Sequence, residues 1–250
     1  MPPGLFEVAL APGTHAWFTL RAAGGEQPAV GHADNMSPYR PHVVSQLAVD
    51  RRHVAERIGY PVSTWHHMRQ VHDATVAVVD ERWPIGAIAD ASDGIVTSMP
   101  NRPLVVHVAD CVPVLLATRE VIGAVHVGRR GLVAGVLDAA LERLARHDAP
   151  LAACIGPSIR GCCYEVGHDL QAQVTADHPQ ARATTTWGTP ALDLAAAVEA
   201  RLDAWAADVT LVDACTHCDP ARRWFSHRQD ATSGRFAGIV VRTSDTDLRS

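Results

Sequence analysis

Three apolar segments rich in β-branched residues follow one another closely near the middle of the chain. Residues 104–109, 112–117 and 121–127 each have the length and composition of a strand whose two faces are both buried. A continuous apolar run of this length is typical of an interior sheet rather than of a surface strand. These segments therefore predict a sheet in the core of the fold.

Further strands and helices alternate through the rest of the sequence. We expect strands at residues 71–79, 94–97, 152–155, 209–212 and 239–242, and helices at residues 51–59, 131–147 and 192–206. Residues 24–28 read as a loop, and the stretch that follows to Pro41 looks irregular. Because no linker-like segment divides the chain, the pattern predicts one α/β (α+β) domain over residues 1–250.

Composition limits the classes of function. The formal net charge of -5 argues against a nucleic-acid carrier, which normally presents a basic surface. The start of the sequence lacks the pattern of a signal peptide, and no apolar run is long enough to span a membrane, so we expect a cytoplasmic protein. In that compartment the six cysteines should be reduced, which favours metal binding or chemistry as their special use.

Three short segments each place a good zinc ligand at a strand end or in the following turn: Gln70-Val71-His72, Ala109-Asp110-Cys111-Val112-Pro113 and Val125-His126-Val127-Gly128-Arg129-Arg130-Gly131. Imidazole and thiolate both bind zinc, and three protein ligands leave a fourth position for water or substrate. Spacing alone does not decide the matter. A cysteine beside a buried strand is usually a small core residue, and a histidine in a strand is usually hydrogen-bonded.

These segments belong to a longer series of motifs that runs in the same order as in a known family. The further matches are Ser92-Asp93-Gly94-Ile95-Val96-Thr97, Ile155-Gly156-Pro157-Ser158-Ile159, Cys162-Cys163-Tyr164-Glu165-Val166-Gly167, Leu192-Asp193-Leu194, Cys215-Thr216, Phe225-Ser226-His227-Arg228 and Gly234-Arg235. The chain thus resembles the family once called laccase-domain or polyphenol oxidase proteins, now regarded as purine nucleoside phosphorylases and also linked to peptidoglycan editing.

The resemblance implies a function and a set of metal ligands. It implies Zn²⁺ bound by His72, Cys111 and His126, phosphorolysis of adenosine, inosine, guanosine and methylthioadenosine, and deamination of adenosine. The partners would then be purine nucleosides and phosphate. It also implies a layered sandwich of mixed sheets flanked by helices. Cu²⁺ could occupy such a site in vitro, because copper outcompetes zinc at many nitrogen and sulfur ligands.

Candidates for the remaining roles lie beside these motifs. Asp110 could serve as the acid or base of a deamination, or it could orient a histidine ligand. Phosphorolysis needs an anion site, for which the planar fork of arginine is suited. Arg51, in a segment similar to the family's V-x-x-N-R, is the first candidate. Arg21, in a segment similar to FTTR, and Arg130, in the turn after His126, are the others.

Two features of the sequence are not explained by the resemblance to the family. Arg129 replaces the tryptophan of the family's VHAGWRG, which puts a cation where a flat apolar wall is expected; it would either alter the substrate or point to solvent. Cys215 and Cys218 form a Cys-x-x-Cys. No second Cys-x-x-Cys completes a four-cysteine site, although Cys162 and Cys163 could assist, so we expect reduced cysteines that bind no metal.

Three other functions remain open. A copper-dependent phenol oxidase would need several His-x-His pairs, and the sequence contains none among its 14 histidines. A cysteine hydrolase would use Cys111 as the nucleophile and His126 or His72 as the base, which a bound metal would rule out. A non-catalytic accessory protein of the cell wall would retain the ligands without turnover.

Overall fold

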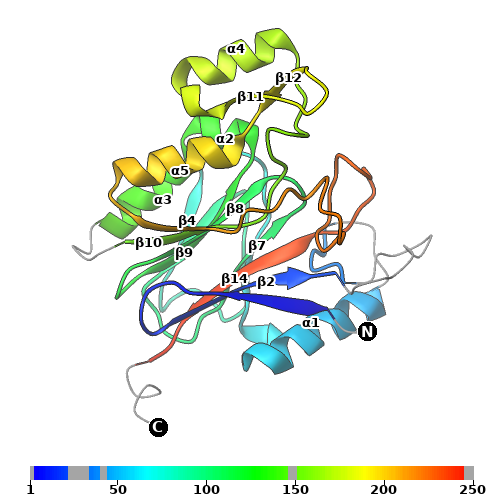
Figure 1. Ribbon diagram of the computed structural model, residues 1–250. Coiled ribbons are helices and arrows are strands. Elements are labelled where there is room, and N and C mark those ends of the chain that lie inside the picture. Colours follow the sequence, from blue (N-terminus) through cyan, green and yellow to red (C-terminus); the bar gives the residue numbers. More distant parts are fainter. Residues whose placement is uncertain (1–2, 22–33, 40–43, 146–150, 245–250) are drawn as a thin grey trace.

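The computed structural model describes residues 3–21, 34–39, 44–145 and 151–244. The loop expected at residues 24–28, much of the irregular stretch that follows it, and the expected end of a helix at His147 lie outside these ranges. Two six-stranded mixed sheets form the centre of the molecule, and a two-stranded hairpin lies apart from them (Figure 1).

The first sheet has the strand order β1-β2-β14-β7-β3-β5. Its strands are β1 (Gly4–Val8), β2 (Thr14–Leu20), β14 (Phe236–Arg242), β7 (Leu104–Val108), β3 (His66–Met68) and β5 (Ile88–Ala89). β14 lies antiparallel between β2 and β7 and thereby joins the two ends of the chain to its middle.

The second sheet has the order β13-β10-β8-β9-β6-β4. Its strands are β13 (Asp208–Leu211), β10 (Ala152–Ile155), β8 (Val112–Ala117), β9 (Ile122–Val127), β6 (Gly94–Thr97) and β4 (Val76–Val79). The hairpin consists of β11 (Arg182–Thr184) and β12 (Pro190–Leu192).

Side chains from the facing surfaces of the two sheets form one shared core. Phe18, Val106 and Phe236 from the first sheet pack with Leu115 and Ile122 from the second. Residues that alternate with these along the strands point to the outer faces, which are also buried. Both faces of each central strand are therefore apolar, which accounts for the uninterrupted apolar runs in the sequence.

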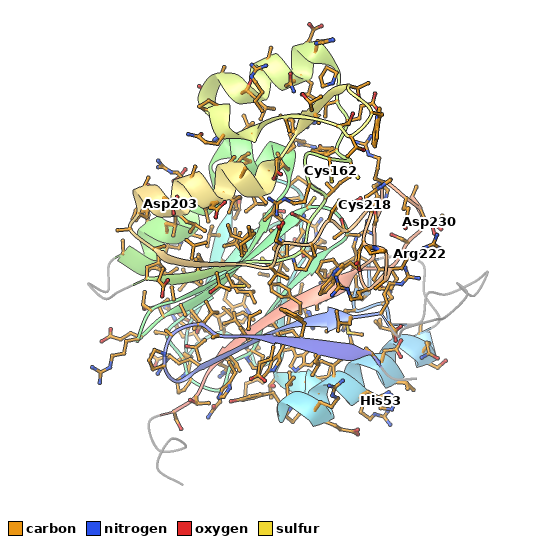
Figure 2. The ribbon with its side chains drawn as sticks, viewed as in Figure 1. His53, Cys162, Asp203, Cys218, Arg222 and Asp230 are labelled. Carbon is orange, nitrogen blue, oxygen red and sulfur yellow. The ribbon has the colours of Figure 1, made fainter. Side chains whose placement is uncertain are left out.

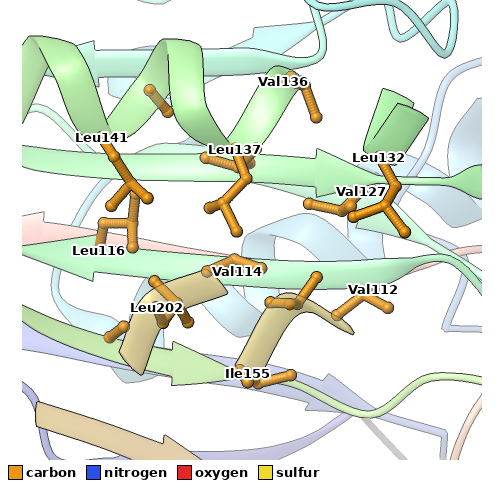
Figure 3. Packing of buried hydrophobic residues seen from close by; sticks show 14 of the residues in the cluster. Val112, Val114, Leu116, Val127, Leu132, Val136, Leu137, Leu141, Ile155 and Leu202 are labelled. Atoms are coloured by element: carbon orange, nitrogen blue, oxygen red, sulfur yellow. The ribbon is translucent and has the colours of Figure 1, made fainter. Parts of the chain in front are cut away.

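Helices cover the outer face of each sheet. α1 (Val44–Ile58) packs on the first sheet through Val54 and Ile58. On the second sheet lie α2 (Arg129–Ala134), α3 (Val136–Leu144) and α5 (Leu194–Ala204). α4 (His168–Asp177) lies farther out, against β12 and the 3₁₀ turn η3 (Pro179–Ala181), and a second 3₁₀ turn, η1 (Val62–Thr64), follows α1 (Figure 1). Leu137 and Leu141 of α3 face Val114 and Leu116 of β8 (Figure 3). The layers thus run helix, sheet, sheet, helix.

The helix expected at residues 131–147 is in fact two helices. Gly135 has a φ of 85°, in the left-handed region that favours glycine, and it ends α2 and begins α3. The break lets the short α2 follow directly from β9 while α3 turns to lie along the sheet. The helical periodicity of the sequence did not reveal this change of direction.

The expected fold class, a layered sandwich of mixed sheets flanked by helices, is confirmed. Most expected elements are present with boundaries shifted by a few residues, although the strand expected at residues 71–79 begins only at Val76. Six strands (β1, β2, β3, β5, β11 and β12) and the helix α4 were not expected. That residues 1–250 form one domain stays a prediction. None of the described helices is long and apolar enough to cross a membrane.

Leu115→Ala should lower the free energy of unfolding by about 2–5 kcal/mol, because it opens a cavity between the two sheets where Leu115 is fully buried. Urea unfolding followed by circular dichroism measures the change. Ile85→Ala is the control: Ile85 is 63% exposed, and its truncation should change the free energy by less than about 0.5 kcal/mol. Equal effects of the two substitutions would contradict this description of the core.

Candidate metal centre

Three side chains from separate parts of the chain meet at one end of the second sheet. The metal-binding atoms of His72, Cys111 and His126 all lie within 4.8 Å of one another. His126 is in β9, Cys111 directly precedes β8, and His72 lies in the loop between β3 and β4. β8 and β9 are antiparallel neighbours with Val112 opposite Val127, so their pairing places Cys111 next to the end of β9.

The carboxylate of Asp93 fixes both histidine-bearing segments. Its Oδ1 accepts hydrogen bonds from His126 Nδ1 at 2.7 Å and from the backbone N–H of His72 at 2.9 Å. Its Oδ2 accepts from the backbone N–H groups of Val71 and Asp73. Because Nδ1 of His126 carries the donated proton, its Nε2 is left as the metal-binding atom.

Asp93 is fully buried, and burial alone would favour its neutral form. The hydrogen bonds from His126 and from the backbone outweigh that cost and hold the pKa of Asp93 below its usual value. The carboxylate therefore stays charged, and it remains an acceptor for all four donors across the neutral pH range.

Cys111 and His126 shift each other's proton affinity in the absence of a cation. Burial disfavours the Cys111 thiolate, but the charge and hydrogen bonds of His126 and His72 outweigh it and lower the pKa of Cys111 to about 6. Burial likewise opposes the His126 imidazolium, but Cys111 and Asp93 raise its pKa to about 9. The thiolate, which is the form that binds metals, is thus already favoured at neutral pH.

Gly128 leaves the space that these side chains occupy. A Cβ atom built on Gly128 would lie 2.7 Å from Cδ2 of His72 and 3.2 Å from Sγ of Cys111. His72 itself has a φ of 65°, an uncommon conformation that aims its ring at Cys111, with Nε2 3.8 Å from the sulfur. His72 and Cys111 are therefore packed closely against the backbone of Gly128.

The donor set fits a catalytic zinc ion. Two imidazoles and one thiolate are zinc ligands, three is the number that catalytic sites use, and the Asp93–His126 pair is the kind of outer support that metal-binding histidines have. His72 is exposed and Cys111 half-buried, so one side of the cluster is open. A multi-copper centre would need more histidines than the described residues gather at this point.

Two cavities open beside the cluster and share Cys111, Ala109 and His227 in their walls. The larger, of 370 Å³, is also lined by His72, His126, Ser37, Tyr39, Met68, Arg69, Gln70, His107, Val108 and Arg235. The smaller, of 170 Å³, is lined by Asp110, Arg129, Ile159, Tyr164, Leu194 and Arg228. Arg129, whose direction the sequence left open, therefore faces a cavity.

His107 is a further polar residue of the larger cavity, to which the sequence reasoning gave no role. It is buried, it stacks on His67 with ring centroids 5.1 Å apart, and its ring nitrogens find no hydrogen bond of good geometry among the described residues. The Met36 carbonyl is a weak neighbour. Burial, with His67 and Arg51 nearby, lowers the pKa of His107 well below the usual value, so the ring is neutral.

Asp110 lies next to the cluster, but its carboxylate is engaged elsewhere. Oδ1 accepts a hydrogen bond of 2.6 Å from the Thr216 hydroxyl, and Oδ2 accepts one of 2.6 Å from the backbone N–H of Arg228. Asp93, and not Asp110, is the carboxylate that holds a histidine of the cluster. Asp110 ties the loop of Cys111 to two loops near the C-terminal end of the described chain.

The structure does not bring the three candidate arginines together at the cluster. Arg51 of α1 donates to the Met36 carbonyl, at 3.0 Å from Nε. Its burial, partly offset by Tyr39, lowers its pKa to about 10, so the side chain stays charged. Arg21 lies over the Phe225 ring, and Arg130 is exposed on α2. The arginines that line the larger cavity are Arg69 and Arg235.

A sequence signal existed for Asp93 and for His107. Asp93 is an acidic residue directly before an apolar strand, and β6 pairs with the strand that carries His126. His107 interrupts an otherwise apolar buried run. Both residues are polar groups in segments where burial of such a group needs a partner or a function.

Comparison with known proteins shows the family to which the chain belongs. A family model described as "Multi-copper polyphenol oxidoreductase laccase" matches residues 15–243. A curated protein of Streptomyces griseus named "Purine nucleoside phosphorylase ORF3" is 39% identical over 233 residues, which cover 91% of this chain and 92% of that protein.

Two solved structures share the fold. YlmD from Geobacillus stearothermophilus has a TM-score of 0.81 at 27% identity and covers 93% of each chain. The hypothetical protein YfiH of Bacillus licheniformis has a TM-score of 0.79 at 25% identity and covers 92% of this chain and 93% of its own. On these matches, over nearly its whole length, the chain belongs to the family described as multi-copper polyphenol oxidoreductase laccase.

Proposed function

We propose that this chain is a zinc-dependent purine nucleoside phosphorylase that also deaminates adenosine, and that inosine, guanosine and methylthioadenosine are further substrates. The observation that carries the proposal is the convergence of His72, Cys111 and His126 on the wall of a 370 Å³ cavity. A cavity of this volume falls within the range of small-molecule sites. The name of the Streptomyces griseus relative supports the nucleoside and phosphate as reactants.

The three side chains hold the metal, and Asp93 keeps His126 in the tautomer that can bind it. When bound, a zinc ion supplies a Lewis acid that polarises a substrate oxygen or activates a water molecule. The chain's own residues orient the nucleoside against that point. The open face of the cluster lies in the wall of the cavity, so the substrate reaches it without displacing a ligand.

Other residues that line the larger cavity supply contacts for the purine base and for the phosphate anion. His107 is neutral and buried, so it suits the polar edge of a purine better than it suits phosphate. Arg235 brings positive charge to the same cavity, where phosphate would need it, and Arg69, which is paired with Asp90, lines it too. Arg51 acts indirectly. It donates a hydrogen bond to the carbonyl of Met36, which directly precedes the segment whose residues Ser37 and Tyr39 line the cavity.

A cysteine hydrolase is the second candidate, because the thiolate of Cys111 beside a protonated His126 is also the arrangement of a cysteine nucleophile. The two functions differ in one property. A nucleophilic Cys111 works without metal and is blocked by it, whereas the proposed phosphorylase loses activity when a chelator removes the metal.

Cys111→Ala should remove the metal from this cluster and abolish both phosphorolysis and deamination, because two histidines alone do not make the site. Metal analysis of the purified protein, with adenosine turnover in the presence and absence of phosphate, measures both effects. Cys154→Ala is the control, since Cys154 is buried in β10 away from the cluster. A Cys111→Ala protein with full activity would contradict the proposal.

Gly128→Ala should weaken zinc binding by about 10- to 100-fold, the range seen when support of a ligand is disturbed. The backbone of Gly128, with φ -84° and ψ 169°, suits alanine, so the effect comes from the contact of the new Cβ with His72 and Cys111. Zinc titration against a competing chelator measures it. Gly167→Ala is a matched control: Gly167 also precedes a helix in extended conformation, and nothing lies within 4 Å of its Cβ position. Equal affinities would show that the cluster does not bind the metal.

Arg51→Ala should lower kcat/KM for phosphorolysis by about 10-fold or more, in line with the loss of a hydrogen bond from a charged donor. Deamination should change by less than about threefold, because we propose that Arg51 positions the Ser37–Tyr39 segment for phosphate, which deamination does not use. Arg52→Ala, an exposed neighbour on the same helix, is the control. Parallel assays of inosine with phosphate and of adenosine without it give the comparison, and an equal loss of both reactions would argue against a role for Arg51 in phosphate use.

A further inference from the structure

A second cluster of metal-binding side chains lies outside the proposed active site. The Sγ atoms of Cys162, Cys163, Cys215 and Cys218 are all within 4.8 Å of one another. They come from two loops, one after β10 and one after β13. Cys162 and Cys218 face each other on the same side of the molecule, with their sulfur atoms 3.8 Å apart (Figure 2).

This convergence changes the interpretation of the Cys-x-x-Cys motif. The sequence contains no second Cys-x-x-Cys, which favoured reduced cysteines without a metal. The fold supplies the missing pair from a different motif, because the loop with Cys162 and Cys163 lies beside the loop with Cys215. Ser158 and Cys215 form an isolated parallel bridge, in which the Thr216 N–H donates to the Ser158 carbonyl at 3.0 Å.

We propose that Cys162, Cys163, Cys215 and Cys218 bind a second, structural zinc ion. Zinc with four thiolates at about 2.3 Å in a tetrahedron needs sulfur atoms separated by about 3.8 Å. The distance between Cys162 and Cys218 has this value, whereas a disulfide needs about 2.05 Å. Binding is not a redox step: the thiols release their protons to solvent and zinc keeps its charge of +2.

The surroundings of Cys215 suit a metal-bound thiolate. The backbone N–H of Arg160 lies 3.5 Å from its sulfur, and the N–H groups of His217 and Cys218 also point at it. N–H donors that converge on one sulfur stabilise its negative charge and are the kind of outer support that tunes metal–thiolate sites. Among metals, an all-thiolate tetrahedral set selects zinc or iron, and zinc needs no redox partner.

The proposed ion would stabilise loops that contact the residues around Cys111. Thr216, between Cys215 and Cys218, donates to Asp110 at 2.6 Å, and Asp110 adjoins the ligand Cys111. Tyr164, next to Cys163, lines the smaller cavity and lies under the Arg228 guanidinium, 5.3 Å from its ring centroid. One ion that joins the two loops would therefore fix the positions of Thr216, which bonds to the neighbour of Cys111, and of Tyr164, which lines the smaller cavity with Cys111.

Zinc content per chain tests the inference separately from the proposed activity. The protein purified without added chelator should hold two zinc ions, Cys218→Ser and Cys162→Ser one each, and Cys111→Ala one, while Cys154→Ala keeps two. Loss of zinc in Cys218→Ser but not in Cys111→Ala would support this site and contradict the active-site metal. Unchanged zinc content in both Cys218→Ser and Cys162→Ser would overturn the inference.

Labelling of the unmodified protein covers the case in which a variant fails to fold. Cys218 is exposed, yet a thiol reagent should modify it slowly until a chelator removes the zinc, after which peptide mapping should show rapid labelling of Cys162 and Cys218. Cys154, buried in β10, should stay unlabelled in both conditions. Rapid labelling of Cys218 before chelation, or a Cys162–Cys218 disulfide in the freshly purified protein, would contradict the proposal.

Discussion

The buried carboxylate of Asp93 is the interaction on which the site depends. It accepts hydrogen bonds from three consecutive backbone N–H groups in the loop of His72 and from the ring of His126. One side chain thus fixes the position of the His72 loop, the tautomer of His126 and the distance between the two histidines. Because the carboxylate is fully enclosed, loss of any donor would leave part of a buried charge without a hydrogen-bond partner.

The layered fold explains how such distant segments can meet with this accuracy. Adjacent antiparallel strands bring Cys111 and His126 together, and a loop that starts at the other sheet supplies His72. Cys111, directly before β8, and His126 of β9 are therefore carried by the rigid core, whereas His72 depends on the hydrogen bonds that its loop makes with Asp93. Gln70 contributes as well, because its side-chain amide pairs with both backbone groups of His107 in β7.

The sequence predicted every strand of the second sheet but missed four of the six strands of the first, for a physical reason. Strands buried on both faces, such as β8 and β10, are continuous apolar runs that end where packing ends, and their predicted bounds match the structure. β3 and β5 are only two or three residues long and take their conformation from their neighbours, so they carry no periodicity to detect. The convergence of four cysteines was equally invisible, since it depends on two loops being side by side. Asp93 stood in a recognised motif, but only the pairing of β6 with β9 shows what it holds.

The alternation of side chains along β9 limits which insertions and deletions the sequence can accept during evolution. Val125 and Val127 face the helices, whereas Ile122 and Ala124 face the other sheet, so His126 belongs to the surface between the sheets. Removing or adding a single residue inside β9 would reverse every side chain beyond that point, burying the imidazole among the helices. The connections between the layers can therefore accept insertions and deletions. The length of β9 cannot change, because His126 must face the surface between the sheets.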